Sequence, residues 1–312
     1  MMKKAQDEIY TTSSIGAFQA CPKMYDLRIN KRLEAIDRPS YFVLGSLFHE
    51  AKEQWALAVR DGDIGNALGR AIEVIGSADV KDEDVRCKAT EMIRAYSRRY
   101  LTSDTRLEYL SIEEPFRCKT PMGKSLAGIC DGIVRDVGGK LWVLETKTAA
   151  TVDESYKKRM SHQRQAMLYT YAMTRATGHS GYDVVGVLYD FVQKPSIRRK
   201  KATPADKMRY TKDGELYSGQ REYDEGDAEY MERIRKWYHD GPEGKLQRME
   251  VVFSRHQLDA FEKSIHKTIK LIEVCGEEFG EDGWPESQSA CMANRTPCEF
   301  SDYCWSGDSE LQ

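Results

Sequence analysis

Residues 127–148, AGICDGIVRDVGGKLWVLETKT, contain two apolar segments on either side of the turn Val137-Gly138-Gly139. Two strands joined by a three-residue loop that ends in glycine form a common β-hairpin. With this loop Asp131 lies directly opposite Glu145, and residues directly opposite each other project from the same face. Lys147 shares that face because side chains alternate along a strand. A two-residue loop would turn Asp131 to the other face, so the register tests the prediction.

Two carboxylates and an ammonium group on an apolar sheet cost free energy unless they are solvated, paired or bound to metal. Carboxylate oxygens suit Mg²⁺ or Mn²⁺. Such an ion polarises a phosphoryl oxygen and generates hydroxide, and a nearby lysine orients the water or stabilises charge. An isolated Glu-x-Lys is more often a surface ion pair. The aspartate in matching register favours a site for phosphodiester hydrolysis.

The segments around this hairpin predict an α/β protein with a mixed β-sheet flanked by helices. The helix expected after the lysine strand is long and is closed by Gly178, a residue that favours helix C-termini. The remaining elements follow from hydrophobic periodicity and turn residues. The expected helical segments are 11–60, 64–103, 154–177, 227–239 and 255–276, and the expected strands are 109–116, 127–136, 140–148 and 183–193.

We expect one domain over residues 1–312, made of four parts. An N-terminal helical part (11–106) precedes the core that contains the hairpin (107–194), and a C-terminal part (227–312) carries helices and cysteines. The polar segment 196–226 separates the core from the C-terminal part. It contains several glycines and a proline, and it predicts an inserted loop or charged hairpin rather than core.

The composition is that of a globular protein, with 40% hydrophobic and 31% charged residues among 312 and a net charge of −3. It excludes a mainly membrane-embedded or disordered chain. The N-terminus has no apolar segment behind its basic residues, so we expect no secretory signal and a cytoplasmic protein. Two local basic runs, 157–159 and 198–201, could bind a nucleic acid, although each alone is more typical of a solvated surface.

Eight cysteines occur in the chain, and three of them, Cys291, Cys298 and Cys304, are clustered near the C-terminus. Four thiolates suit a [4Fe–4S] cluster, and Cys21, which precedes a proline, could supply the fourth. The spacing contains no Cys-x-x-Cys knuckle of the kind that zinc sites use. Unrelated buried thiols, or a zinc site completed by a histidine, stay open as alternatives. The other cysteines (87, 118, 130 and 275) are expected to be buried and inert.

Asp131 and Glu145-Thr146-Lys147 resemble motifs II and III of the PD-(D/E)-x-K nucleases, in particular the RecB-like branch. Gly45-x₃-His49 resembles that branch's metal-ligating histidine, and Gln165-x₃-Tyr169 resembles its motif on the following helix. Cys130 stands where many members have proline. The resemblance implies a restriction-endonuclease-like core with residues in three roles. These are catalytic Asp131, Glu145 and Lys147; metal-binding His49, Asp131, Glu145 and Thr146; and strand-positioning Gln165 and Tyr169.

Cys21-Pro22-x₂-Tyr25 and the terminal segment around Pro297-Cys298 resemble the iron–sulfur members of this branch. These include the AddB nuclease domain, the exonucleases of CRISPR adaptation modules and similar phage proteins. The resemblance implies a structural [4Fe–4S] cluster on Cys21, Cys291, Cys298 and Cys304. Such a cluster would join the two ends of the chain and hold the helix of His49 beside the sheet.

We therefore expect a Mg²⁺- or Mn²⁺-dependent deoxyribonuclease, an exonuclease on single-stranded DNA or DNA ends. One alternative is a non-catalytic module that binds DNA ends in a recombination or CRISPR-adaptation complex. Another is a nuclease clasped by zinc. The sequence contains no Walker A loop, so ATP-driven unwinding would come from a partner such as a helicase.

Overall fold

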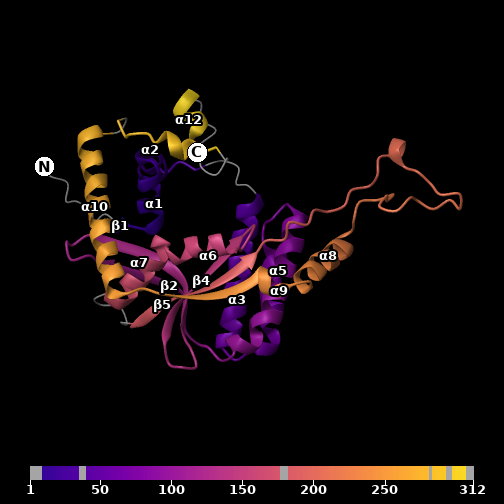
Figure 1. The fold of residues 1–312 in the computed structure, drawn as a ribbon, viewed down its shortest axis with the longest axis horizontal. Coiled ribbons are helices and arrows are strands. Elements are labelled where there is room, and N and C mark those ends of the chain that lie inside the picture. Colours follow the sequence, from indigo (N-terminus) through magenta and orange to yellow (C-terminus); the bar gives the residue numbers. More distant parts are fainter. Residues whose placement is uncertain (1–8, 35–39, 176–181, 281–282, 293–296, 307–312) are drawn as a thin grey trace.

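The computed structural model describes residues 9–34, 40–175, 182–280, 283–292 and 297–306 (Figure 1). A six-stranded mixed sheet forms the centre, and helices cover both of its faces. This mixed α/β architecture is the one that the sequence predicts. The strands are β1 (Ile9–Tyr10), β2 (Glu108–Lys119), β3 (Ser125–Arg135), β4 (Leu141–Ala149), β5 (Val184–Gln193) and β6 (Leu246–Val252).

Strand β3 organises the sheet because it has partners along both edges. β2 pairs with it antiparallel over nearly its whole length. On its other edge β1 pairs parallel at its start, and β4 pairs antiparallel at its end. β4 then pairs parallel with β5, and β5 pairs antiparallel with β6. The parallel β4–β5 pair requires a crossover connection, which the chain makes through two helices.

Two hydrophobic cores lie on opposite faces of the sheet, and neighbouring strand residues alternate between them. Val143 packs into the first core, whereas Trp142 and Leu144 pack into the second. The helices of the first core are α1 (Thr12–Ala20), α7 (Arg164–Arg175) and α10 (Arg255–Phe279). Those of the second are α3 (Ser40–Arg60), α4 (Ala67–Ser77), α5 (Glu83–Asp104) and α8 (Asp227–His239).

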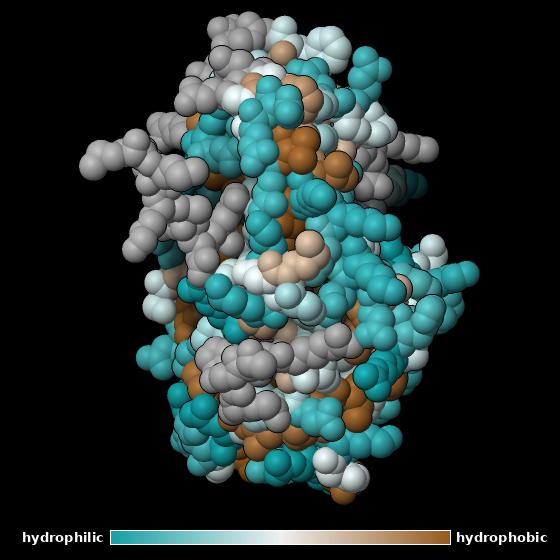
Figure 2. All heavy atoms as spheres, turned by 90° about the vertical axis from the view of Figure 1, so that its left-hand side faces the viewer, coloured by the Kyte–Doolittle hydropathy of each residue, from teal (hydrophilic) through white to brown (hydrophobic). Residues whose placement is uncertain are grey.

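Shorter elements complete the chain. They are α2 (Pro22–Tyr25), a π-helical turn (Asp26–Asn30), a 3₁₀ turn (Ile64–Asn66), α6 (Glu154–Ser161), α9 (Pro242–Lys245), α11 (Gln288–Cys291) and α12 (Ser301–Ser306). The side of the molecule that faces the viewer in Figure 2 is mainly hydrophilic, with several separate hydrophobic patches. Among the described residues no helix is both long and apolar enough to cross a membrane.

The hairpin of β3 and β4 has the predicted loop and register. Gly132 pairs with Leu144 and Arg135 with Leu141. The backbone N–H of Asp136 donates to the Lys140 carbonyl at 2.9 Å, which closes the turn. Gly139 has φ of 83°, a left-handed conformation that glycine adopts without steric cost. The glycine at the end of the loop therefore determines which residues face each other.

The single helix expected over 154–177 is wrong, because two helices, α6 and α7, occupy that segment. The Ser161 hydroxyl donates to the Lys158 carbonyl at 2.8 Å, and His162 Nδ1 lies 2.8 Å from the same oxygen. These side chains take up a carbonyl that a continuing helix would use, so α6 ends there. Gly178, the expected C-cap, lies outside the described residues.

Three other expectations on the elements need correction. The helical segment 11–60 is interrupted at Cys21, where Pro22 starts a new helix. The segment 64–103 is two helices, because the Asp82 side chain accepts from the Asp84 amide and caps a new start. β1 and β6 were not expected at all. β6 alternates charged and apolar residues at an edge of the sheet, which gives a weak strand signal.

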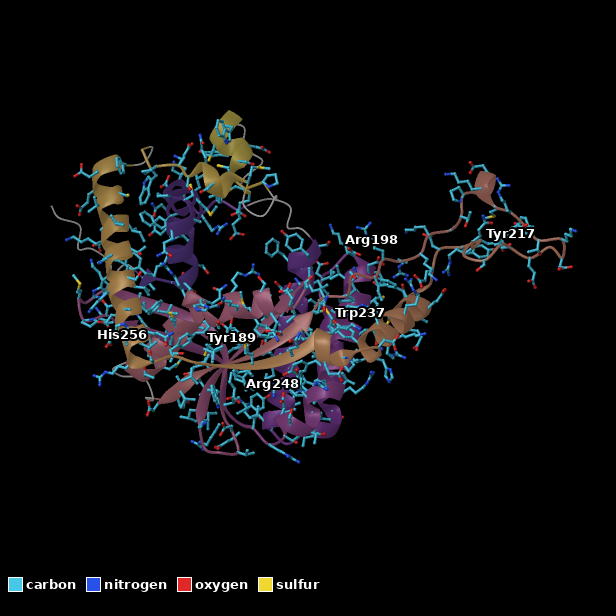
Figure 3. The ribbon with its side chains drawn as sticks, in the orientation of Figure 1. Tyr189, Arg198, Tyr217, Trp237, Arg248 and His256 are labelled. Atoms are coloured by element: carbon cyan, nitrogen blue, oxygen red, sulfur yellow. The ribbon has the colours of Figure 1, made fainter. Side chains whose placement is uncertain are left out.

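The insertion 196–226 forms an arm that extends away from the body on the side of α8 (Figure 1). It contains a 3₁₀ turn (Ala205–Lys207) and one isolated bridge between Tyr210 and Leu216. In this arm, all of which the structure describes, no side chain from 196 to 224 is buried. Figure 3 shows Arg198 near the root of the arm and Tyr217 far out along it. The segment expected as a charged loop or hairpin thus corresponds to this arm.

Candidate active site

The two hairpin strands provide the centre of the candidate site at the point where their pairing ends. Beyond the Gly132–Leu144 pair, the Asp131 side chain contacts the neighbouring strand: its Oδ2 accepts from the Thr146 backbone N–H at 2.7 Å. The carboxylate thus occupies a position next to β4. A local register determined by the turn therefore places Asp131 beside Glu145-Thr146-Lys147.

Lys147 is held by two partners, one on its own strand and one on α7. Its Nζ lies 2.5 Å from Glu145 Oε1 and donates to Gln165 Oε1 at 2.8 Å. Gln165 donates in turn to the Tyr169 hydroxyl at 2.7 Å, and that hydroxyl donates to the Ile129 carbonyl at 2.8 Å. Residues four apart share a helical face, which explains the spacing of the pair. The pair links β3, α7 and the lysine; contact with a DNA strand stays a prediction.

His49 reaches the site from α3. Its Nδ1 lies 3.5 Å from Asp131 Oδ2. The glycine one turn before it, Gly45, explains how the helix comes so close to the sheet. A Cβ at that position would lie 3.2 Å from Thr148 Oγ1 and 3.3 Å from Lys194 Nζ. The Gly-x₃-His pattern therefore has a steric basis: the glycine lets α3 approach the sheet, and this approach brings the histidine close to Asp131.

A pocket of about 730 Å³ opens beside His49 and Asp131. Three further carboxylates line it: Glu50, Glu53 and Glu113. Glu113 lies on β2 and has φ of 51°. Its neighbours Ile112 and Glu114 pair with Gly132 and Cys130, which are the neighbours of Asp131. Burial, followed by the charges of Asp131 and Glu53, raises the pKa of Glu113 to about 7. Glu113 was not expected from the sequence; its place in the strand that pairs with the strand of Asp131 could have indicated it.

Glu145 is the most strongly perturbed carboxyl of the site. The residue is only 2% exposed, and its Oε2 has no hydrogen-bond partner among the described residues. Burial and the neighbouring charge of Asp131 raise its pKa to about 8, although Lys147 and Lys52 act in the opposite direction. A buried oxygen without a partner costs free energy, and a bound cation would recover that cost.

The surroundings of His49 favour its neutral form. Burial lowers its pKa, and the nearby ammonium groups of Lys52, Lys147 and Lys194 add to this effect, while Asp131 opposes it. A neutral imidazole has a free lone pair, which is the form that binds a metal ion. The electrostatics of the pocket therefore favour the ligating form of the histidine, whereas the carboxyl groups of Glu145 and Glu113 must lose a proton when an ion binds.

The chemistry of these donors fits a divalent cation. The carboxylates of Asp131 and Glu145 are hard ligands, and the unpartnered Oε2 of Glu145 is available to one. Within the described part of the chain, no group of three or more His, Cys, Asp or Glu side chains is yet close enough together to hold an ion. His49 and Asp131 form a pair, and Glu145 interacts with Asp131 through its charge.

A buried network behind the site escaped the sequence analysis. Lys52 on α3 donates to Thr146 Oγ1 and, at 2.9 Å, to Asp190 Oδ2. Arg248 donates to Asp190 at 2.6 Å and to Asp104 at 2.7 Å. Burial opposes ionisation of Asp190, but Lys52 and Arg248 outweigh it and hold the pKa of this carboxyl well below its usual range. Figure 3 shows Arg248 on β6, across the sheet from the helices of the first core.

This network fixes the face of β4 opposite to Glu145. Lys52 follows His49 by three residues, so both point from the same side of α3. One helix therefore carries the histidine of the pocket and the lysine that attaches it to β4 and β5. A lysine within an apolar helical face was the available signal, but its partner Asp190 is 138 residues away.

The four cysteines expected at the iron–sulfur site lie around one small cavity, together with Met24 and Phe300. Cys21 accepts a hydrogen bond from the Ser287 backbone N–H at 3.3 Å, and the Cys298 N–H donates to the Cys291 carbonyl at 2.8 Å. Of the other thiols, Cys87, Cys118 and Cys130 are buried as expected, and Cys275 is partly exposed. The four thiols thus line one cavity, but within the described residues no three of them lie close enough together to hold a metal ion.

Comparison with known families gives one match. The family model described as the PD-(D/E)XK nuclease superfamily matches residues 10–305, a range that contains the hairpin, the histidine helix and all four clustered cysteines. No curated protein matches the chain.

Proposed function

The chain belongs to the PD-(D/E)XK nuclease superfamily, whose members are generally metal-dependent nucleases, and from this membership we propose a Mg²⁺- or Mn²⁺-dependent deoxyribonuclease. The observation that carries the proposal is the buried Glu145, whose Oε2 lacks a partner among the described residues, in contact with Lys147 and near Asp131. Superfamily membership by itself supports a nuclease and DNA as the substrate.

In this proposal His49, Asp131 and Glu145 would hold the ion, together with Thr146. Divalent ions at such sites polarise the phosphoryl oxygen and lower the pKa of a bound water. Lys147 places its ammonium next to the attacking water and stabilises the charge that develops on phosphate. Gln165 keeps that ammonium in position, because its amide oxygen accepts from Lys147 at 2.8 Å.

The first test is digestion of DNA in Mn²⁺ by wild type, Glu145→Ala and Lys147→Ala. We expect no measurable activity from Glu145→Ala, which loses a ligand, and a fall of about 10²–10³-fold for Lys147→Ala, as for loss of one charge-stabilising donor. Lys140→Ala, in the exposed turn, is the matched control. Equal residual activity in all the proteins would assign the digestion to a contaminant, and binding without digestion would favour the non-catalytic module.

We further propose that the enzyme is an exonuclease on single-stranded DNA or DNA ends. Support for this finer statement comes from the RecB-like motifs His49, Asp131, Glu145-x-Lys147 and Gln165-x₃-Tyr169. End-labelled linear DNA and a closed single-stranded circle of the same sequence distinguish the two modes. An exonuclease releases short labelled products from the linear substrate and leaves the circle intact, whereas cleavage of the circle would contradict the proposal.

A structural [4Fe–4S] cluster on Cys21, Cys291, Cys298 and Cys304 is the second part of the proposal. It is supported by the position of all four thiols around one cavity, since such a cluster takes four cysteine thiolates. Its role would be mechanical, because it would join segments that are far apart in the chain.

Anaerobically purified protein tests the cluster. We expect a brown protein with about four iron atoms per chain, and loss of the colour with a lower melting temperature in Cys298→Ser. Cys275→Ser is the control, since that thiol lies away from the cavity. Stoichiometric zinc without iron would instead support the zinc-clasped alternative, and a metal-free protein of full stability would remove both.

A further inference from the structure

A second pocket, of about 770 Å³, is lined by residues of α1, α6, α7 and α10, and we call it the basic groove. Its floor and walls come from the start of α1, the turn between α6 and α7, and α10. Four nitrogen-rich side chains line it at the α6–α7 turn: Lys158, Arg159, His162 and Arg164. The break between the two helices, which the sequence did not predict, brings these residues to the groove.

The charges of the two pockets are opposite. Among the described residues that line the basic groove, none is acidic. The pocket beside His49, in contrast, is lined by Glu50, Glu53, Glu113 and Asp131. The chain as a whole has a net charge of −3, so the segregation does not follow from composition. A cation fits the acidic pocket, and an anion fits the basic groove.

The cations of the groove are available to a ligand. Lys158, Arg159 and Arg164 are exposed, and none of them forms an ion pair with any residue that the structure describes. Their neighbour Lys157, which does not line the groove, pairs instead with Glu154. The Arg159 guanidinium lies over the Tyr156 ring at 5.1 Å, a contact that holds the side chain in place without neutralising it.

One hydrogen bond connects the groove to the catalytic lysine. Gln165 lines the groove, and its amide oxygen accepts from Lys147 Nζ at 2.8 Å. A polyanion in the groove would therefore be separated by one side chain, Gln165, from the lysine that contacts Glu145. A groove that binds an unrelated ligand would not need a hydrogen-bonded connection to Lys147.

We propose that the basic groove binds the sugar–phosphate backbone of the DNA substrate, on the side of the cleaved phosphodiester away from the His49 pocket. The proposal rests on the proposed nuclease function and names the surface that holds its substrate. Arg159 and Arg164 contact consecutive phosphates, and Lys158 adds a third charge. Contacts of this kind carry no sequence preference and give an affinity that depends strongly on salt.

The test is the binding of a fluorescein-labelled single-stranded oligonucleotide in EDTA, followed by fluorescence anisotropy over a range of salt concentrations. Arg159→Gln/Arg164→Gln is the test variant, and Arg98→Gln/Lys236→Gln is the matched control. The two control residues are exposed on α5 and α8 and line neither pocket. Thermal melting shows that both variants fold.

We expect the test variant to bind at least about tenfold more weakly at low salt, and the slope of log K against log salt to fall by about 1.4, because each phosphate contact to a single strand contributes about 0.7. The control variant should match wild type. With active protein in Mn²⁺, the KM of the test variant should rise while kcat at saturating DNA stays unchanged, since neither arginine contacts the reacting phosphate.

An unchanged salt slope in the test variant, or an equal loss in the control, would overturn the proposal, the latter because it reveals a general charge effect. Binding in EDTA is measured without cleavage. If wild type fails to digest DNA but binds it more tightly than the test variant does, the result would therefore contradict the nuclease function and support the groove. A protein that binds an acidic polypeptide in this groove and no DNA would overturn the assignment of the ligand.

Discussion

Glu145 shows how one buried side chain can indicate a chemistry. Its carboxyl is enclosed, one oxygen contacts Lys147, and the other has no partner in the described part of the chain. A group held only for stability would be expected to have both oxygens satisfied. The raised pKa, about 8, means that the protein without metal keeps a proton on Glu145 near neutral pH. Cation binding must release that proton, so metal affinity should increase with pH over this range.

The same pKa predicts how the stability of the metal-free protein varies with pH. In the unfolded protein the pKa of a glutamate is about 4.3, whereas in the folded protein the pKa of Glu145 is about 8. Between these two pKa values the folded state binds more protons than the unfolded state. The stability that the protonated Glu145 contributes is therefore fully present below about pH 4.3 and is lost as the pH rises toward about 8, by at most about 1.4 kcal/mol per pH unit.

We expect Glu145→Gln to remove this dependence, because glutamine does not titrate. Urea unfolding in EDTA at pH 6, 7 and 8 measures it. Glu154→Gln, at an exposed position on α6, is the control and should follow wild type. A wild-type protein whose unfolding free energy increases from pH 6 to 8 relative to Glu145→Gln would contradict the assignment.

At the scale of elements, two glycines allow neighbouring elements to approach each other closely. Gly45 lets α3 lie against the end of β4. Gly186 lets β6 pair tightly with β5, since a Cβ there would lie 2.0 Å from the Val251 carbonyl oxygen. The Lys52–Asp190 ion pair then attaches α3 to the sheet. The position of His49 thus depends on a glycine for distance and on a buried lysine for orientation.

Gly186→Ala should destabilise the protein by about 1–3 kcal/mol or more, because the added methyl group forces β5 and β6 apart. Gly69→Ala on α4 is the matched control, since a Cβ there meets nothing within 4 Å. That change should stabilise the helix by about 0.5–1 kcal/mol. Chemical denaturation of both variants measures the difference, and equal stability of the two would show that β5 and β6 relax without cost.

At the scale of the whole molecule, the two ends of the chain pack together through residues other than the cysteines. The Tyr25 and Trp284 rings stack with centroids 5.5 Å apart, and the Lys23 N–H donates to the Pro285 carbonyl at 3.0 Å. Arg28 also pairs with Glu299. The N- and C-terminal segments therefore pack on each other beside the first core. A cluster on the four cysteines would strengthen a contact that other residues already make.

The arm is the opposite case, a large feature outside both cores. Replacing residues 202–222 by a short Gly-Ser turn should leave the melting temperature within a few degrees of wild type, because none of these residues is buried in the described structure. Thermal unfolding by circular dichroism measures this. A loss of cooperative unfolding on deletion would mean that the arm supports the fold. Unchanged stability with altered activity would assign it a role in substrate or partner binding.

The sequence by itself determined the hairpin, its register and the expectation that Asp131 lies beside Glu145-x-Lys147, because a tight turn acts on residues that are close along the chain. It also indicated His49, Gln165 and the four cysteines, through motifs whose spacing reflects one helical turn or one cluster. Tertiary structure alone decided what those motifs contact. Lys52 finds Asp190 and Arg248, Glu113 lies beside Asp131 across two strands, and the α6–α7 break turns a basic run into a groove. These pairings join segments that are far apart in the chain. They stabilise the protein only after both cores have formed, so no local sequence pattern encodes them.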